Sequence, residues 1–93
     1  MTTPTPVLER DVTTEEVLGP PYVLLLFDDN VNSMDHVVNS LTHCVPELDH
    51  ARAADVMLEA HANGMARVIT CPHDRAARYR NCLESFTATI EPA

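Results

Sequence analysis

The distribution of apolar and polar residues predicts one small domain that begins near residue 21. From Tyr22 to Phe27 every side chain is apolar. A run of this length between a proline pair and an aspartate pair is typical of a strand covered on both faces, and it is too short for a helix. We expect it to be the central strand of a sheet. Residues 1–20 combine several prolines with no apolar periodicity, so we expect a flexible N-terminal extension there and one domain over residues 21–93.

Two helices are predicted to follow this strand. Asn32, at the end of a polar turn, can cap a helix in which apolar residues recur at helical spacing until Pro46 ends it. Asp49 is then a suitable N-cap for a second helix. That helix is expected to stop at Asn63-Gly64, because glycine readily adopts the left-handed conformation that ends many helices.

The remainder of the chain predicts a second strand, a short third helix and a third strand. We expect strand from Ala66 to Thr70, a helix start at Pro72 to Asp74, and helix from Arg75 to about Leu83. Phe86 to Ile90 alternates between apolar and polar residues, as a half-buried strand does. The order strand, helix, helix, strand, helix, strand predicts an α+β fold with helices packed on one face of a three-stranded sheet.

The charge balance argues against some classes of partner. The 93 residues contain 14 Asp and Glu against 6 Lys and Arg, a formal net charge of -8. A phosphate backbone would be repelled, so no nucleic acid is expected. The acidic surface either docks on a basic patch of another protein or only keeps the chain soluble. No apolar run approaches the ~20 residues that span a bilayer, and no secretion signal is visible. We therefore expect a cytoplasmic monomer without a membrane partner.

The cysteines and arginines allow further interpretations. Three cysteines without paired spacing predict free thiols in a reducing compartment rather than a disulfide framework. They also lack the spacing of a zinc site and the organised base of a thiol enzyme, so we expect no metal and no cofactor. The arginines near the third helix form either a solvated face or part of a docking surface. They are Arg75, Arg78 and Arg80.

One polar turn could carry a binding site. Asp28, Asp29 and Asn30 follow a buried strand directly, and His61 shares a helix face with Met57 four residues earlier. If the two helices pack together, carboxylate, imidazole and methionine groups would surround a cationic head with an apolar side chain attached. The alternative is a plain turn and a surface histidine, and residue types alone leave both open.

Three stretches together resemble the signature stretches of the ClpS adaptors, in the same order. They are residues 22–38, the Met-Leu-Glu-Ala-His-Ala-Asn-Gly segment at 57–64, and residues 89–93. The resemblance implies a ClpS-like antiparallel sheet and a binding protein that is not an enzyme. Members of this family hold proteins by a free α-amino group and a bulky apolar first side chain, the N-degron. They deliver them to the N-terminal domain of a ClpA or ClpC unfoldase for degradation by ClpP.

The resemblance also assigns an amine-binding role to four residues. Asp28 stands where many members have Asn, Asp29 matches the family's Asp, and Asn30 stands where they have a second Asp. His61 matches the histidine that contacts the α-amino group. Because the amide and one carboxylate have exchanged places, we expect Asp28 to pair directly with the ammonium.

The apolar pocket follows from the same comparison. Met34, Val37 and Met57 match its wall, with Met57 as the gating residue, and Phe86 takes the place of a leucine. Ala60 replaces a larger β-branched residue, which predicts a roomier pocket. The segment after Gly64 is shorter than in common members, so the third helix, which carries part of the family's unfoldase-docking surface, is trimmed.

Two other functions remain open from the sequence. The changed turn is compatible with a ClpS-like modulator of the unfoldase that does not bind N-degrons. A small hydrolase that uses His61 with Asp28 or a cysteine is supported by residue types alone.

Overall fold

The computed structural model describes residues 20–93, and its elements follow the predicted order. The elements are β1 (Pro21–Phe27), α2 (Met34–Cys44), α3 (His50–Asn63), β2 (Met65–Pro72), α4 (His73–Cys82) and β3 (Ala88–Pro92). The α+β class is therefore confirmed. Residues 1–19 of the predicted extension lie outside the described residues.

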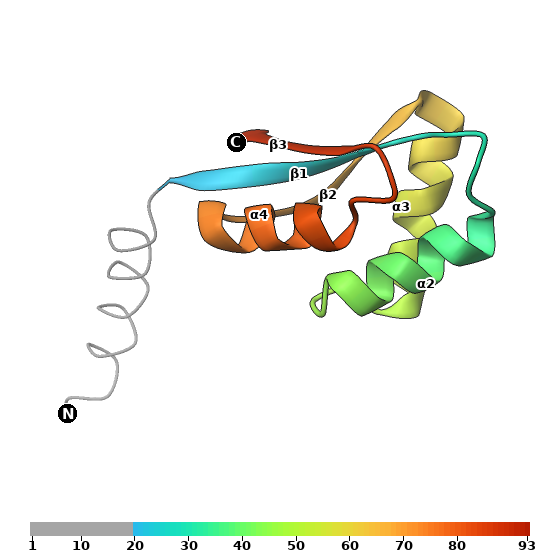
Figure 1. Ribbon diagram of the computed structural model, residues 1–93, viewed down its shortest axis with the longest axis horizontal. Coiled ribbons are helices and arrows are strands. Elements are labelled where there is room, and N and C mark those ends of the chain that lie inside the picture. Colours follow the sequence, from blue (N-terminus) through green and yellow to red (C-terminus); the bar gives the residue numbers. More distant parts are fainter. Residues whose placement is uncertain (1–19) are drawn as a thin grey trace.

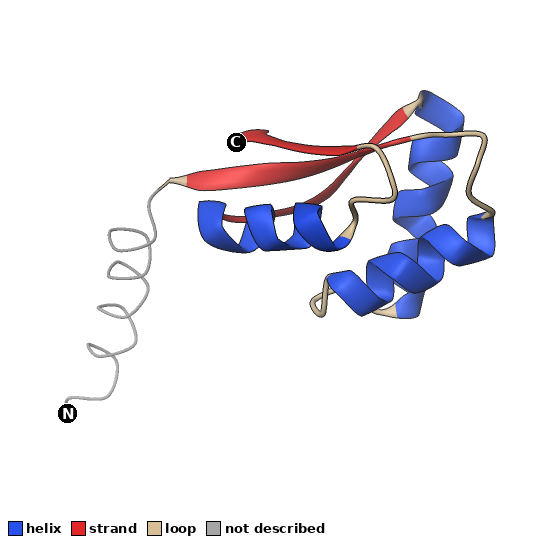
Figure 2. Cartoon of the chain, viewed as in Figure 1, coloured by secondary structure: helices blue, strands red, loops and turns tan. Residues whose placement is uncertain are grey.

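The sheet has the strand order β2-β1-β3, and both pairings are antiparallel. This confirms β1 as the central strand. In Figure 1, α4 lies along one face of the sheet, while α2 and α3 lie near the end where β1 leads into its following turn. Figure 2 shows the same grouping by element type, with one helix beneath the strands and two beyond them. The turn after β1 thus meets both of these helices.

The uniform apolar sequence of β1 reflects burial on both faces. Leu24 and Leu26 belong to the core cluster shared with the helices. Val23 and Leu25 point to the opposite face, because successive strand residues alternate, yet they are only 2% and 6% exposed. Their cross-strand partners are polar: Thr70 and Glu91 for Val23, Arg67 and Thr89 for Leu25. Polar neighbours thus flank an apolar central row on the face away from the helices.

The start of α2 differs from the prediction by one residue. Ser33, not Asn32, is the N-cap, and its Oγ accepts a hydrogen bond from the His36 backbone N–H at 3.2 Å. Asn32 is engaged elsewhere, since its Nδ2 donates to Asp29 at 3.1 Å. Both residues are good cap formers, so sequence alone did not separate them.

Both predicted ends of α3 are confirmed. The Asp49 side chain accepts a hydrogen bond from the Arg52 backbone N–H at 2.8 Å. Gly64 adopts the left-handed conformation with φ of 85°, and its N–H donates to the carbonyl of Ala60 at 2.7 Å. The helix therefore stops where glycine makes that backbone conformation inexpensive.

The predicted start of α4 agrees with the structure, and the predicted start of β3 needs correction. Helix α4 begins at His73, within the helix start predicted at Pro72 to Asp74. Phe86 is not in a strand: its N–H donates to the carbonyl of Leu83 at 2.9 Å, which places it in a turn, and β3 begins at Ala88. The alternation of apolar residues continues through this turn, so the pattern could not mark the boundary.

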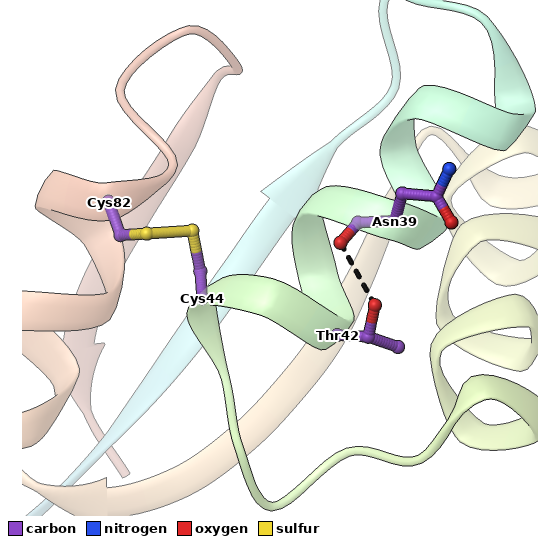
Figure 3. The surroundings of a disulfide bond; sticks show 4 residues. All are labelled: Asn39, Thr42, Cys44 and Cys82. Atoms are coloured by element: carbon purple, nitrogen blue, oxygen red, sulfur yellow. Dashed lines mark hydrogen bonds between the residues drawn. A yellow bond between two sulfur atoms is a disulfide. The ribbon is translucent and has the colours of Figure 1, made fainter.

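The expectation of three free thiols is wrong for two of them. Cys44 and Cys82 form a disulfide with a Cα–Cα distance of 5.7 Å (Figure 3). They are separated by 38 residues, and it is the fold that brings the C-terminal ends of α2 and α4 together. Cys71 is free and buried, and its burial raises the pKa of its thiol.

The core joins the sheet to all three helices in one cluster. Burying a large aliphatic side chain contributes about 1.5–3 kcal/mol, so the fully buried residues carry much of the stability. The largest are Leu24, Leu41, Leu83, Val45 and Val56. A polar link reinforces this core beside α4: the carboxylate of Glu47 accepts hydrogen bonds from Arg75 Nη1 and the Tyr79 hydroxyl, both at 2.7 Å.

Candidate functional site

A cavity of about 300 Å³ lies at the end of β1, between the turn, α2 and α3. All nine residues that the resemblance singled out line it, although they come from four separate parts of the chain. They are Asp28, Asp29, Asn30, Met34, Val37, Met57, Ala60, His61 and Phe86. The fold therefore places these side chains around one space, and their roles in binding stay predictions.

One corner of the cavity is polar and open. His61 Nδ1 lies 3.7 Å from Asp28 Oδ1, and the two side chains are 58% and 34% exposed. This separation is longer than a good hydrogen bond. Within residues 20–93, no donor is hydrogen-bonded to the Asp28 carboxylate. The corner thus offers a carboxylate whose acceptor sites are unused, beside an imidazole.

Asp29, the next residue, is in a different situation. Its Oδ1 accepts hydrogen bonds from the backbone N–H groups of Val31 and Asn32 at 2.9 and 2.8 Å, and its Oδ2 accepts from Asn32 Nδ2. The hydrogen bonds from Asn32, led by its backbone N–H, hold the pKa of Asp29 below its ordinary value. Asp29 therefore shapes the turn and leaves Asp28 as the carboxylate with free acceptor sites.

Gly64 connects the turn that carries Asp28 to the end of α3, which carries His61. Its carbonyl accepts a hydrogen bond from the Asp28 backbone N–H at 3.0 Å. Its own left-handed conformation ends α3 three residues after His61. A side chain at this φ would be strained. Gly64 lies three residues after His61, so its hydrogen bond to the Asp28 backbone holds Asp28 close to His61.

The inner part of the cavity is apolar. Val37 comes from α2, Ala60 from α3 and Phe86 from the turn after α4, and Phe86 is only 9% exposed. Met34 is 47% exposed. The imidazole ring of His36 packs against the ring of Phe86, with the two centroids 5.3 Å apart. Methionine side chains adapt easily to an apolar ligand.

Four lining residues were missed by sequence reasoning. Leu26 and Phe27 line the cavity from the end of β1, and Asn32 and Ser33 from the turn. Leu26 and Phe27 were assigned only to the strand, and Asn32 only to helix capping. Their position directly before and after the Asp28–Asn30 turn was the signal that could have found them.

The part of the chain that the structure describes holds no cluster of metal-ligating side chains. Within residues 20–93, no group of three or more His, Cys, Asp or Glu side chains could hold a metal ion. Two of the three cysteines are joined as a disulfide. No helix of the described chain combines the length and apolar character needed to cross a membrane.

A family model described as the ATP-dependent Clp protease adaptor protein ClpS matches residues 18–91. The chain belongs to the ClpS family. Among its relatives, the adapter protein ClpS of Synechococcus elongatus is 40% identical over 88 residues, which cover 92% of this chain and 93% of that protein. The chloroplastic CLPS1 of Arabidopsis thaliana is 33% identical over 95 residues, covering 98% of this chain and 58% of that protein.

A solved ClpS structure shares this fold. Agrobacterium tumefaciens ClpS2 bound to L-phenylalaninamide superposes with a TM-score of 0.72 at 22% identity, covering 80% of this chain and 98% of that one. The likeness concerns the fold. The ClpS family and the ClpS-like fold predicted from the sequence are thus both confirmed.

Proposed function

We propose that this ClpS-family chain is an adaptor that binds substrate proteins by a free N-terminal residue and delivers them to a ClpA- or ClpC-type unfoldase for degradation by ClpP. The observation that carries the proposal is the composition of the cavity. An open carboxylate and imidazole form one corner, and apolar side chains line the space behind it. An N-terminal residue has the matching arrangement, an ammonium group attached to a side chain.

The polar corner is suited to an α-ammonium group. The 3.7 Å between His61 Nδ1 and Asp28 Oδ1 lets one nitrogen lie within hydrogen-bond reach of both atoms. The ammonium would donate to the Asp28 carboxylate and to a neutral His61, and the third N–H would point to Asn30 or to water. A position inside a polypeptide offers no ammonium, so its binding would desolvate Asp28 without compensation. Selection for chain ends follows from that penalty.

The apolar part is suited to a bulky first side chain. Val37, Met57 and Phe86 provide its walls, and alanine at position 60 leaves space that a larger residue would fill. ClpS2 of Agrobacterium tumefaciens was solved with L-phenylalaninamide, a molecule with a free amine and a benzyl side chain. That ligand chemistry supports a bulky apolar residue in the corresponding space here.

The proposal assigns no catalytic step to the chain. Binding through Asp28 and His61 requires no bond to be broken, and unfolding and cleavage belong to the partner. We further propose that the chain acts as a cytoplasmic monomer and docks on the N-terminal domain of the unfoldase. Its net charge of -8 is compatible with docking on a basic patch of that domain. The extension over residues 1–20 is assigned a part in delivery by family resemblance.

Fluorescence anisotropy tests the proposal. Peptides that begin with Leu, Phe, Tyr or Trp are titrated with the protein beside their N-acetylated twins, and recovered peptides are checked for cleavage. We expect micromolar or tighter binding of the free amines, little binding of the acetylated twins, and intact peptides. If no peptide bound while the protein still bound an unfoldase N-terminal domain, the modulator function would replace the adaptor function. Cleaved peptide would favour a hydrolase.

A further inference from the structure

The Cys44–Cys82 disulfide joins two segments that both carry walls of the cavity. Cys44 ends α2, and Val37 lies seven residues before it, which places the two on the same helix face. Cys82 ends α4, and Phe86 follows four residues later. Figure 3 shows the bridge between the end of α2 and the helix that faces it. Along the chain, the disulfide is therefore only seven residues from the cavity on the α2 side and four residues from it on the α4 side.

A second contact between α2 and the segment that follows α4 is noncovalent. The His36 ring, on α2, packs against the Phe86 ring with centroids 5.3 Å apart and planes inclined by 37°. The turn with Phe86 is held by two backbone hydrogen bonds of 2.9 Å: the Phe86 N–H donates to the carbonyl of Leu83, and the carbonyl of Thr87 accepts from the Phe27 N–H. The disulfide and this ring contact both join α2 to the segment from Cys82 to Phe86. Opening the disulfide would leave the ring contact and the core beneath it to position Phe86.

We propose that the Cys44–Cys82 disulfide holds the two sides of the first-residue pocket together, so that a dithiol reductant which opens it loosens the pocket and weakens peptide binding. The inference rests on the proposed function and adds that the redox state of the disulfide controls peptide affinity. A pocket whose walls are fixed before binding loses less conformational freedom when a ligand enters. Freed from the bridge, α2 and the turn with Phe86 keep only their noncovalent contacts, so the ligand has to supply more of their order.

The exposure of the two cysteines defines the chemistry. Cys82 belongs to the exposed residues, whereas Cys44 is only 9% exposed. A thiolate of the dithiol attacks Sγ of Cys82, the disulfide breaks, and Cys44 leaves as a thiolate that takes a proton from water. The second thiolate of the reductant then attacks the mixed disulfide and releases Cys82. Two electrons pass to the protein, and the reductant leaves as a disulfide.

Two readouts on the full chain test the inference. The protein is oxidised to the disulfide form, verified by mass, and compared with the same sample treated with dithiothreitol. Hydrogen exchange is followed at the amides of Val37 and Phe86, with Leu24 of the central strand as the internal reference. Anisotropy with a free-amine phenylalanine peptide gives the affinity of each form.

We expect reduction to speed exchange at Val37 and Phe86, to leave Leu24 unchanged, and to weaken the peptide Kd about 3- to 10-fold. A Cys44→Ala/Cys82→Ala variant should match the reduced protein whether or not dithiothreitol is present. The Cys71→Ala variant keeps the disulfide and should respond as the unaltered protein does.

The inference would be overturned by the absence of a disulfide under oxidising conditions, by unchanged exchange on reduction, or by an equal response to dithiothreitol in the Cys44→Ala/Cys82→Ala variant. Faster exchange with an unchanged Kd would also overturn it. If exchange responded to reduction but neither form bound the peptide, the proposed adaptor function would fail, while the disulfide's hold on the pocket walls would stand.

Discussion

Asp28 and Glu47 each lie beside a basic side chain, and their surroundings differ in how many hydrogen bonds the carboxylate already makes. Glu47 accepts hydrogen bonds from Arg75 and from the Tyr79 hydroxyl, each at 2.7 Å. Burial, together with the hydrogen bond to Glu47, raises the pKa of Tyr79. Asp28 faces His61 at 3.7 Å and, within residues 20–93, accepts no hydrogen bond.

The difference separates a structural link from a candidate binding site. The acceptor sites of Glu47 are used within the protein, so a ligand would gain little there and would have to break existing contacts. Asp28 keeps its acceptor sites directed at solvent and the cavity, where an incoming ammonium can use them. A carboxylate and a nearby basic group are therefore not enough to identify a site. Unused acceptor sites at the rim of an apolar cavity are what distinguish Asp28 from Glu47.

The largest effect is expected from Asp28→Ala. Removing the carboxylate leaves the bound ammonium without its charged partner, which typically costs about 2–5 kcal/mol of binding free energy. Isothermal titration calorimetry with a free-amine phenylalanine peptide measures the loss. Asp28→Asn is the matched control, since it keeps the shape and removes only the charge. Unchanged affinity in Asp28→Ala would remove Asp28 from the site.

A change in stability without a change in affinity is expected from Glu47→Ala. The substitution leaves the Tyr79 hydroxyl and the Arg75 guanidinium without their partner, so the free energy of unfolding should fall by about 1–3 kcal/mol. Urea denaturation followed by circular dichroism gives that value. If peptide affinity fell as far as in Asp28→Ala, Glu47 would contribute to peptide binding too, which would contradict the proposed difference between the two carboxylates.

The apolar end of the cavity is expected to respond to size. Ala60→Val adds two methyl groups to the wall and should weaken binding of peptides that begin with Trp relative to Leu by about 1–3 kcal/mol. Ala53→Val is the matched control, because Ala53 is also buried on α3 but does not line the cavity. It should lower stability and leave the ratio of Trp to Leu affinities unchanged. The same ratio in both variants would argue that Ala60 does not face the first side chain.

The smallest effect concerns Asp29, whose carboxylate is used within its own turn. Its pKa is lowered, so the folded state favours the ionised form. Its contribution to stability is complete above the ordinary aspartate pKa of about 3.9 and is lost as pH falls through the lowered value. The amide resonances of Val31 and Asn32 should therefore titrate below pH 4 in an NMR series, and Asp29→Asn should abolish that titration. A midpoint at or above the ordinary aspartate pKa would show that the turn does not depend on these hydrogen bonds.

Much of the fold could be predicted because local patterns and the global fold agree. The apolar run at Tyr22 to Phe27 identified the central strand, and Asp49 and Gly64 marked both ends of α3. The errors lie where two residues of similar chemistry compete, as Asn32 and Ser33 do for the cap of α2. They also lie where an apolar pattern runs through a turn, as at Phe86.

Nine of the thirteen residues that line the cavity could be predicted, but their hydrogen bonding could not. The family resemblance named the nine residues that now line one cavity and singled out Asp28 for the ammonium, but no pattern showed the difference in hydrogen bonding between Asp28 and Asp29. That difference depends on where the backbone N–H groups of Val31 and Asn32 point, which only the folded turn defines. The disulfide was missed for a related reason, since Cys44 and Cys82 are brought together by the packing of two helices.

The most direct test of the central claim, that Asp28 contacts the α-ammonium of the first residue, is a double cycle of binding constants. The Kd of a free-amine phenylalanine peptide and of its N-acetylated twin is measured for the unaltered protein and for Asp28→Ala. We expect acetylation to weaken binding to the unaltered protein by at least tenfold and to have a much smaller effect in Asp28→Ala, where the contact of the ammonium with Asp28 is already lost and only the contact with His61 remains. An acetylation penalty that is equally large in both proteins would mean that the ammonium is bound elsewhere.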